Sequence, residues 1–221
     1  MIEVYGRQVF TTLEEIVDPT HTALVVIDVQ NDFCSEGGLM HEIGKDLSMM
    51  KGMVGRLGGV LDAARAAGIL PIYIQNSWLP RHRAASGAWL RFMVVRYGMD
   101  PERGCTVEGT WGAEILPEVA PRAGDVVVKK WRSSAFVGTN LDMVLRCNDV
   151  KTVVVTGDVT QGCVESTARD AAFYDYYVVV LDDCVATYEQ DLHEASLKVL
   201  RTRVDVARSD EVVGIWATAR R

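Results

Sequence analysis

Residues 152–170 read Thr-Val-Val-Val-Thr-Gly-Asp-Val-Thr-Gln-Gly-Cys-Val-Glu-Ser-Thr-Ala-Arg-Asp, which is an apolar strand, a glycine turn and then a helix-forming segment. A strand that leads through a tight turn into a helix is typical of a βα unit in a parallel sheet. Cys163 lies where the helix is predicted to begin. The first turn of a helix has unpaired N–H groups and about +0.5 charge, which stabilise a thiolate and a neighbouring oxyanion. The position therefore predicts a nucleophilic thiol.

Further apolar runs of the same kind occur on both sides of this unit. Buried strands are predicted at 23–28, 69–75, 125–129, 152–156 and 177–181, with a short last strand near 204–207. Helices are predicted at 46–67, 139–148, 162–175 and 189–202. Such continuous hydrophobicity is typical of a parallel sheet covered on both faces. The alternation predicts a single doubly wound, three-layer α/β domain over 1–221, with its core at about 20–207 and its ligands at the carboxyl ends of the strands.

Composition limits the classes of function. The 221 residues are 48% hydrophobic and 24% charged, as in a domain that can bury a full core. The formal charge of −7 comes without a basic stripe, which argues against nucleic acid and anionic membranes as partners. The chain has no apolar run of about 20 residues and no signal-peptide pattern, so we expect a cytoplasmic protein with a small-molecule ligand. Five cysteines without C-x-x-C spacing predict free thiols rather than disulfides or a zinc knuckle.

Three reactive side chains follow predicted strands. Asp28 ends the first strand, Lys130 ends the third and Cys163 follows the fourth, so all three are expected at one edge of the sheet. A buried carboxylate can take the thiol proton while an ammonium holds both groups together. The pattern predicts a nucleophilic site without histidine. Taken alone, Asp28 fits a turn or a helix cap equally well, and the sequence does not choose between Lys129 and Lys130.

These residues lie in three ordered motifs. They are D-x-Q-N-D-F at Asp28–Phe33, K-x-x-x-S-A-F at Lys130–Phe136 and G-x-x-T-x-x-C at Gly157–Cys163. In these motifs the chain resembles the isochorismatase-like cysteine hydrolases, which include nicotinamidases, N-carbamoylsarcosine amidohydrolases and ureidoacrylate amidohydrolases. The resemblance covers about residues 20–207, and the spacing of the second motif selects Lys130 as the reactive lysine.

The resemblance implies a role for each of these residues. Asp28, Lys130 and Cys163 are the implied catalytic triad, and the backbone N–H groups of Val159 and Cys163 are the implied oxyanion hole. A non-proline cis peptide bond is implied between Val159 and Thr160. The implied reaction is hydrolysis of an amide through a thioester, without a cofactor. A homodimer or homotetramer is also implied.

The segment after the second predicted strand departs from the nicotinamidase pattern. Nicotinamidases bind a metal there through an Asp and two His, whereas this chain has Ser77 and Leu79 at the positions of the Asp and the first His, and only His82 remains. We therefore expect no metal and no nicotinamidase. Isochorismatases proper cleave an enol ether without a cysteine nucleophile. The presence of Cys163 favours an amidohydrolase instead.

Candidate substrate-binding residues resemble those of the ureidoacrylate and N-carbamoyl-amino-acid branches. The side chains of Asn76 and Gln161 can exchange hydrogen bonds with a planar, urea-like group. Trp78, Trp111 and Trp131 are candidate walls of a narrow pocket, although packing beneath a long loop explains each tryptophan equally well.

Specificity is expected to lie in the irregular segment 77–124, which is predicted to form loops and short helices over the active face. If the substrate carries a carboxylate, Arg81, Arg91 and Arg132 are its candidate partners, and the sequence does not choose among them. A linear ureide without a carboxylate needs none of them. The predicted function is hydrolysis of a small linear ureide or N-carbamoyl compound, with release of ammonia and carbon dioxide. The alternatives are an amidase of a simple carboxamide such as maleamate or nicotinamide, a non-catalytic scaffold and a thiol redox sensor.

Overall fold

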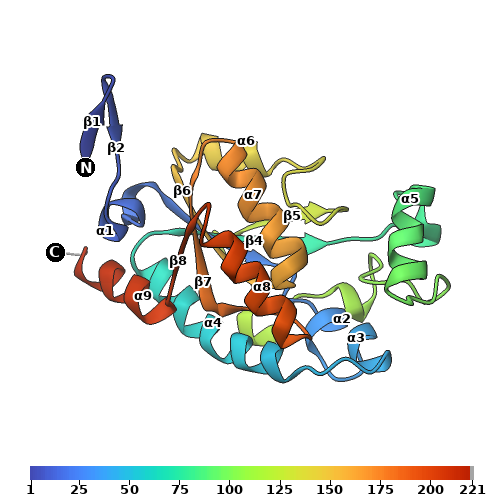
Figure 1. The fold of residues 1–221 in the computed structure, drawn as a ribbon. Helices are drawn as coiled ribbons and strands as arrows, with labels where there is room; N and C mark the ends of the chain where they lie inside the picture. The colour runs from blue at the N-terminus through green and yellow to red at the C-terminus, as the bar shows by residue number, and fades with distance from the viewer. Residues whose placement is uncertain (220–221) are drawn as a thin grey trace.

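A six-stranded sheet forms the centre of the molecule in a computed structural model that describes residues 1–219 (Figure 1). The strand order is β5-β4-β3-β6-β7-β8, and every neighbouring pair is parallel. The strands are β3 (Thr22–Ile27), β4 (Leu70–Asn76), β5 (Val126–Lys130), β6 (Thr152–Asp158), β7 (Tyr177–Ala186) and β8 (Asp205–Ala207). This confirms the predicted α/β fold with its parallel sheet.

Helices cover both faces of the sheet (Figure 1). One face packs against α4 (Ser48–Ala66) and α9 (Ser209–Thr218). The other packs against α6 (Leu141–Cys147), α7 (Glu165–Phe173) and α8 (Gln190–Leu200). Alternate strand residues enter two separate hydrophobic cores, because successive side chains of a strand point to opposite faces. The predicted helices are therefore observed close to their expected bounds.

The strand order reverses between β3 and β6, and this junction positions the site. The chain runs outward from β3 to β4 and β5, then returns to β6 on the other side of β3. In doubly wound sheets such a reversal opens a crevice at the carboxyl ends of the strands. Gly157 of β6 allows the backbones of β6 and β3 to lie close together. Its φ is +105°, and a Cβ there would lie 2.1 Å from the carbonyl oxygen of Ile27. Asp28, with φ of +55°, turns the chain directly after β3.

Two parts of the chain extend from this body (Figure 1). An N-terminal hairpin, β1 (Ile2–Val4) with β2 (Arg7–Val9), lies beside one end of the sheet. Residues 80–104, which we call the outlying segment, contain α5 (Gly87–Leu90) and the π-helical turn Arg91–Arg96. The other short helices are α1 (Leu13–Ile16), α2 (Asn31–Cys34) and α3 (Leu39–Glu42). No helix of the described residues is long and apolar enough to cross a membrane.

Candidate active site

Asp28, Lys130 and Cys163 form one continuous chain of contacts at the carboxyl edge of the sheet. Nζ of Lys130 lies 2.8 Å from Oδ2 of Asp28 and donates a hydrogen bond to Sγ of Cys163 at 3.2 Å. It also donates to the carbonyl oxygen of Arg132 at 3.0 Å. Asp28 and Lys130 are completely buried, whereas Lys129 is exposed. The structure thus brings the three predicted groups together. It also shows that Lys130, and not Lys129, contacts Asp28 and Cys163.

Burial and mutual charge shift the pKa of each group. Burial raises the pKa of Asp28, although the positive charge of Lys130 opposes that rise. Burial likewise raises the pKa of Cys163 to about 12, against the opposing charge of Lys130. For Lys130, burial alone lowers the pKa, but the negative charge of Asp28 and the contact with it outweigh burial and raise it. The thiol is therefore protonated at neutral pH, in contrast to the thiolate that the helix N-terminus favours.

The turn between β6 and Cys163 corrects one prediction. The expected cis bond between Val159 and Thr160 is wrong, because the cis peptide bond lies one residue earlier, between Asp158 and Val159. The strand continues through Asp158, so the chain leaves the sheet directly after that residue and enters the π-helical turn Thr160–Val164. Within residues 1–219 the N–H of Val159 has no protein acceptor, and Val159 lines the cavity above Cys163. This N–H is therefore available to a ligand.

A cavity of about 530 Å³, including the open space at its mouth, lies over Cys163. Two of the predicted substrate-binding residues, Asn76 and Trp78, line it. Nδ2 of Asn76 donates to Oγ1 of Thr106 at 2.8 Å, which fixes the orientation of the side-chain amide. Its carbonyl oxygen Oδ1 has no donor in the described part of the chain. Asn76 can therefore accept a hydrogen bond from a bound amide.

The other three predicted substrate-binding residues do not line this cavity. Trp111 is 49% exposed, and its backbone carbonyl oxygen accepts a hydrogen bond from Nδ2 of Asn31 at 2.9 Å. Trp131 follows Lys130 directly, so its side chain points to the other side of the strand end and lines a small neighbouring cavity. Gln161 precedes Cys163 by two residues in a helical turn, which directs its side chain away from the sulfur.

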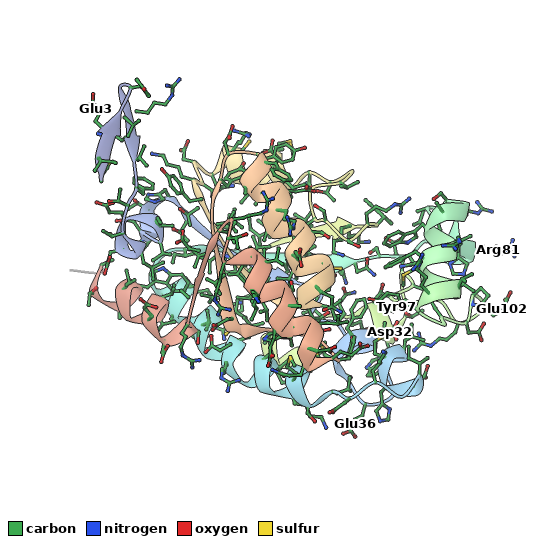
Figure 2. The ribbon with its side chains drawn as sticks, viewed as in Figure 1. Glu3, Asp32, Glu36, Arg81, Tyr97 and Glu102 are labelled. Atoms are coloured by element: carbon green, nitrogen blue, oxygen red, sulfur yellow. The ribbon has the colours of Figure 1, made fainter. Side chains whose placement is uncertain are left out.

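Only one of the three candidate arginines reaches the cavity. Arg132 lines it, whereas Arg81 points outward from the outlying segment (Figure 2) and Arg91 is exposed. The Arg132 guanidinium donates to the carbonyl oxygen of Ala84 at 3.0 Å and lies 5.2 Å from the ring centroid of Trp89. Arg132 therefore connects the outlying segment to the loop that follows the reactive lysine.

His82, the last histidine of the altered nicotinamidase pattern, packs within the outlying segment. Its ring meets Trp78 edge-on at 5.0 Å, and Nε2 contacts the carbonyl oxygen of Pro101. Across residues 1–219, no three side chains of His, Cys, Asp or Glu lie together in an arrangement that could hold a metal ion. The observed contacts assign His82 to packing of the loop.

The first motif positions the loops around the site as well as supplying Asp28. The side chain of Gln30 donates to the backbone carbonyl oxygen of Asn76 at 3.0 Å and accepts from the backbone N–H of Asn76 at 2.7 Å. Asp32 accepts from the N–H of Thr106 at 2.6 Å and pairs with Arg103 at 2.7 Å. Because Thr106 in turn holds the side chain of Asn76, both motif residues fix the wall of the cavity.

Most of the apolar wall was missing from the sequence-based prediction. Trp89, Phe92, Met93 and Tyr97 of the outlying segment all line the cavity. Their spacing of three, four and eight residues from Trp89 is the signal that could have found them, since it is typical of one face of a helix.

Known proteins resemble this chain in sequence and in fold. The model of the isochorismatase domain matches residues 22–211. A ureidoacrylate amidohydrolase of Agrobacterium fabrum is 38% identical over 172 residues, which are 75% of this chain and 75% of that enzyme. A cysteine hydrolase structure from Pseudomonas syringae pv. phaseolicola has a TM-score of 0.79 at 28% identity, over 92% of this chain and 96% of that one. The N-carbamoylsarcosine amidase of Thermoplasma acidophilum has a TM-score of 0.66 at 30% identity, over 86% and 97%. The chain therefore belongs to the isochorismatase-like cysteine hydrolase family, as a hydrolase related to the ureidoacrylate amidohydrolases.

Proposed function

We propose that the protein is a cysteine-dependent amidohydrolase that cleaves a C–N bond of a small linear ureide or N-carbamoyl compound. The observation that carries this proposal is the position of Cys163 at the base of the cavity, in contact with Lys130, which in turn pairs with Asp28. The names of the ureidoacrylate amidohydrolase and the N-carbamoylsarcosine amidase both refer to substrates with a carbamoyl group, which supports the choice of substrate class.

The first half of the reaction forms a thioester. Asp28 accepts the proton of Cys163, and the sulfur attacks the carbonyl carbon of R–NH–CO–NH₂. The N–H groups of Val159 and Cys163 stabilise the oxyanion, and Asp28 donates the proton to the terminal NH₂ group, which departs as NH₃. A carbamoyl thioester, Cys–S–CO–NH–R, remains. The raised pKa of Asp28 suits this role because a base works best when its pKa is not far below that of the acid it deprotonates.

The second half of the reaction hydrolyses the thioester. Asp28 accepts a proton from a water molecule that attacks the carbonyl carbon, and the sulfur of Cys163 leaves and recovers a proton. The product R–NH–COOH decomposes to R–NH₂ and carbon dioxide. Lys130 keeps its proton throughout, because its pKa is raised. Its ammonium group holds the sulfur of Cys163 close to the carboxylate of Asp28.

Asn76 is the proposed ligand of the carbamoyl nitrogen. Its free Oδ1 accepts a hydrogen bond from the terminal NH₂, while Thr106 holds the side-chain amide and Gln30 holds the backbone of Asn76. Such a fixed acceptor orients the scissile bond before attack.

Ammonia and carbon dioxide release test this proposal. The chelator-treated enzyme is assayed with ureidoacrylate, N-carbamoylsarcosine, maleamate and nicotinamide, beside its Cys163→Ala variant. We expect both gases from a ureide, at a rate that falls roughly a thousandfold or more in the variant. Turnover that survives in Cys163→Ala contradicts the proposed nucleophile. Activity on maleamate or nicotinamide alone assigns the enzyme to simple carboxamides instead.

A further inference from the structure

The cavity above Cys163 combines a few polar groups with a large apolar wall. Asn76, Lys130, Arg132, Ser133 and Cys163 supply polar groups to its lining. Large apolar side chains make up most of the remaining wall, and they include Phe33, Trp89, Phe92, Met93, Tyr97 and Tyr188. Asn76 and the N–H groups of Val159 and Cys163 are the proposed ligands of the carbamoyl group, so the apolar wall is available for the rest of the substrate.

The outer wall is an aromatic cluster rather than a set of isolated side chains. In the outlying segment, the ring of Phe92 lies 5.2 Å from that of Trp89 and 5.2 Å from that of Tyr97. Figure 2 shows Tyr97 on the side of this segment that faces the body. The body contributes Phe33 and Tyr188 to the lining of the same cavity, and the Tyr188 hydroxyl donates to the carbonyl oxygen of Phe33 at 3.1 Å. Aromatic rings from both parts of the chain therefore line the cavity.

The charged groups of the cavity are already engaged. Within the described residues, only Lys130 and Arg132 bring a charge to its lining. Lys130 is bound to Asp28 and Cys163, and the Arg132 guanidinium is directed toward Ala84 and Trp89. No carboxylate lines this cavity in residues 1–219. A small, strongly polar substrate would thus leave the aromatic wall in contact with water.

We infer that the substrate is an N-carbamoyl compound whose substituent is apolar, an aromatic ring or a branched aliphatic chain that lies between Phe92 and Phe33. This inference rests on the proposed function and adds the chemistry of the R group to it. Burial of an apolar group favours binding by about 25 cal/mol for each Å² removed from water, and offset or edge-on ring contacts add to this. A hydrophobic pocket distinguishes such substituents by roughly ten- to two-hundredfold.

Two matched substrate pairs test the inference. Benzylurea is compared with methylurea, and N-carbamoylphenylalanine with N-carbamoylglycine, by kcat/KM for ammonia release. We expect the aromatic member of each pair to exceed the small member by roughly tenfold or more. The neutral and anionic pairs also separate the effect of the ring from that of a carboxylate near Arg132.

Variants of the outlying segment show whether its rings are responsible. Phe92→Ala is expected to reduce the aromatic preference, measured as the ratio of kcat/KM for benzylurea to kcat/KM for methylurea, roughly tenfold. Val95→Ala is the matched control, because Val95 lies in the same helical turn, is 69% exposed and does not line the cavity. Calorimetric binding to Cys163→Ala measures the same preference without turnover.

The outcomes separate the two proposals. If the small ureides are hydrolysed as well as the aromatic ones, the inference about the substituent is overturned and the proposed function stands. If no carbamoyl compound is hydrolysed or bound, both fail. An aromatic preference that persists in Phe92→Ala overturns the assignment to this wall.

Discussion

The thiol of Cys34 donates a hydrogen bond to Oδ2 of Asp158 at 3.0 Å, and both side chains are buried. Burial raises the pKa of Asp158 well above its usual range, and the negative charge of Asp28 raises it further. A thiol is a weak donor, and Oδ1 of Asp158 has no partner within residues 1–219. Burial therefore favours the uncharged form of Asp158, which lies directly before the cis peptide bond.

Asp158→Asn is expected to stabilise the protein increasingly as the pH rises. The pKa of Asp158 is higher in the folded than in the unfolded chain, so the folded state holds the proton more tightly and loses stability as the pH rises above the unfolded value of about 4. Asparagine keeps the acceptor for Cys34 and removes this dependence. The gain in unfolding free energy should grow by at most about 1.4 kcal/mol per pH unit.

Melting temperatures of the two proteins between about pH 4 and pH 8 measure this gain. Asp210→Asn is the control, because that carboxylate is exposed, and its melting temperature should follow the wild type at every pH. A difference between Asp158→Asn and the wild type that stays constant with pH would contradict an uncharged Asp158.

The ion pair of Lys130 and Asp28 predicts different effects on stability and on activity. Lys130→Met leaves Asp28 buried without its cation, and removal of one partner of a buried pair costs about 3–5 kcal/mol. In Asp28→Asn/Lys130→Met neither charge is buried, so stability should recover to near the wild-type value. Activity should be lost in both, because the base and the ammonium are missing. Urea unfolding and ammonia release measure the two properties. A double variant no more stable than Lys130→Met would disprove the pairing.

Sequence reasoning predicted the sheet and the meeting of Asp28, Lys130 and Cys163 because both depend on local patterns. Each central strand is a continuous apolar run, and Asp28, Lys130 and Cys163 each follow such a run, so parallel topology alone brings them to one edge. The sequence distinguished Lys130 from Lys129 only through the spacing of the second motif. The structure gives the physical reason, which is that alternate residues of β5 point to opposite faces.

The walls of the cavity were not predictable in the same way. Trp111 and Trp131 were chosen as aromatic residues near motifs, but ring direction depends on contacts with distant parts of the chain, such as the hydrogen bond from Asn31 to the backbone of Trp111. Trp89 and Phe92 lie in a segment whose position relative to the body is set by tertiary contacts, including Arg132 over Trp89. The position of the cis bond was predicted one residue too late for a similar reason. The end of β6 at Asp158 is fixed by its pairing with Ala186 of β7, which is distant in the sequence.

Alkylation of Cys163 by iodoacetamide should be slow at neutral pH and accelerate strongly with pH. Burial raises the pKa of this thiol to about 12, and only the thiolate reacts. The rate is therefore expected to rise roughly tenfold per pH unit between about pH 7 and pH 10. Peptide mass spectrometry separates this reaction from that of Cys147, an exposed thiol in the same chain. A rate at Cys163 that is independent of pH over this range would show a thiolate in the resting enzyme.

Arg132→Lys should weaken substrate binding without preventing catalysis. The guanidinium connects Ala84 and Trp89 of the outlying segment to the loop after β5, and the Arg132 carbonyl oxygen accepts from Lys130. Lysine keeps the charge and the backbone acceptor but lacks the planar guanidinium group with its several donors. We expect KM to rise roughly three- to tenfold, because the lost guanidinium contacts stabilise the wall of the cavity by about 1 kcal/mol, and we expect kcat to stay nearly unchanged. The increase should be equal for benzylurea and N-carbamoylphenylalanine, because a structural connection does not depend on substrate charge. A larger effect on the anionic substrate would instead identify Arg132 as its carboxylate ligand.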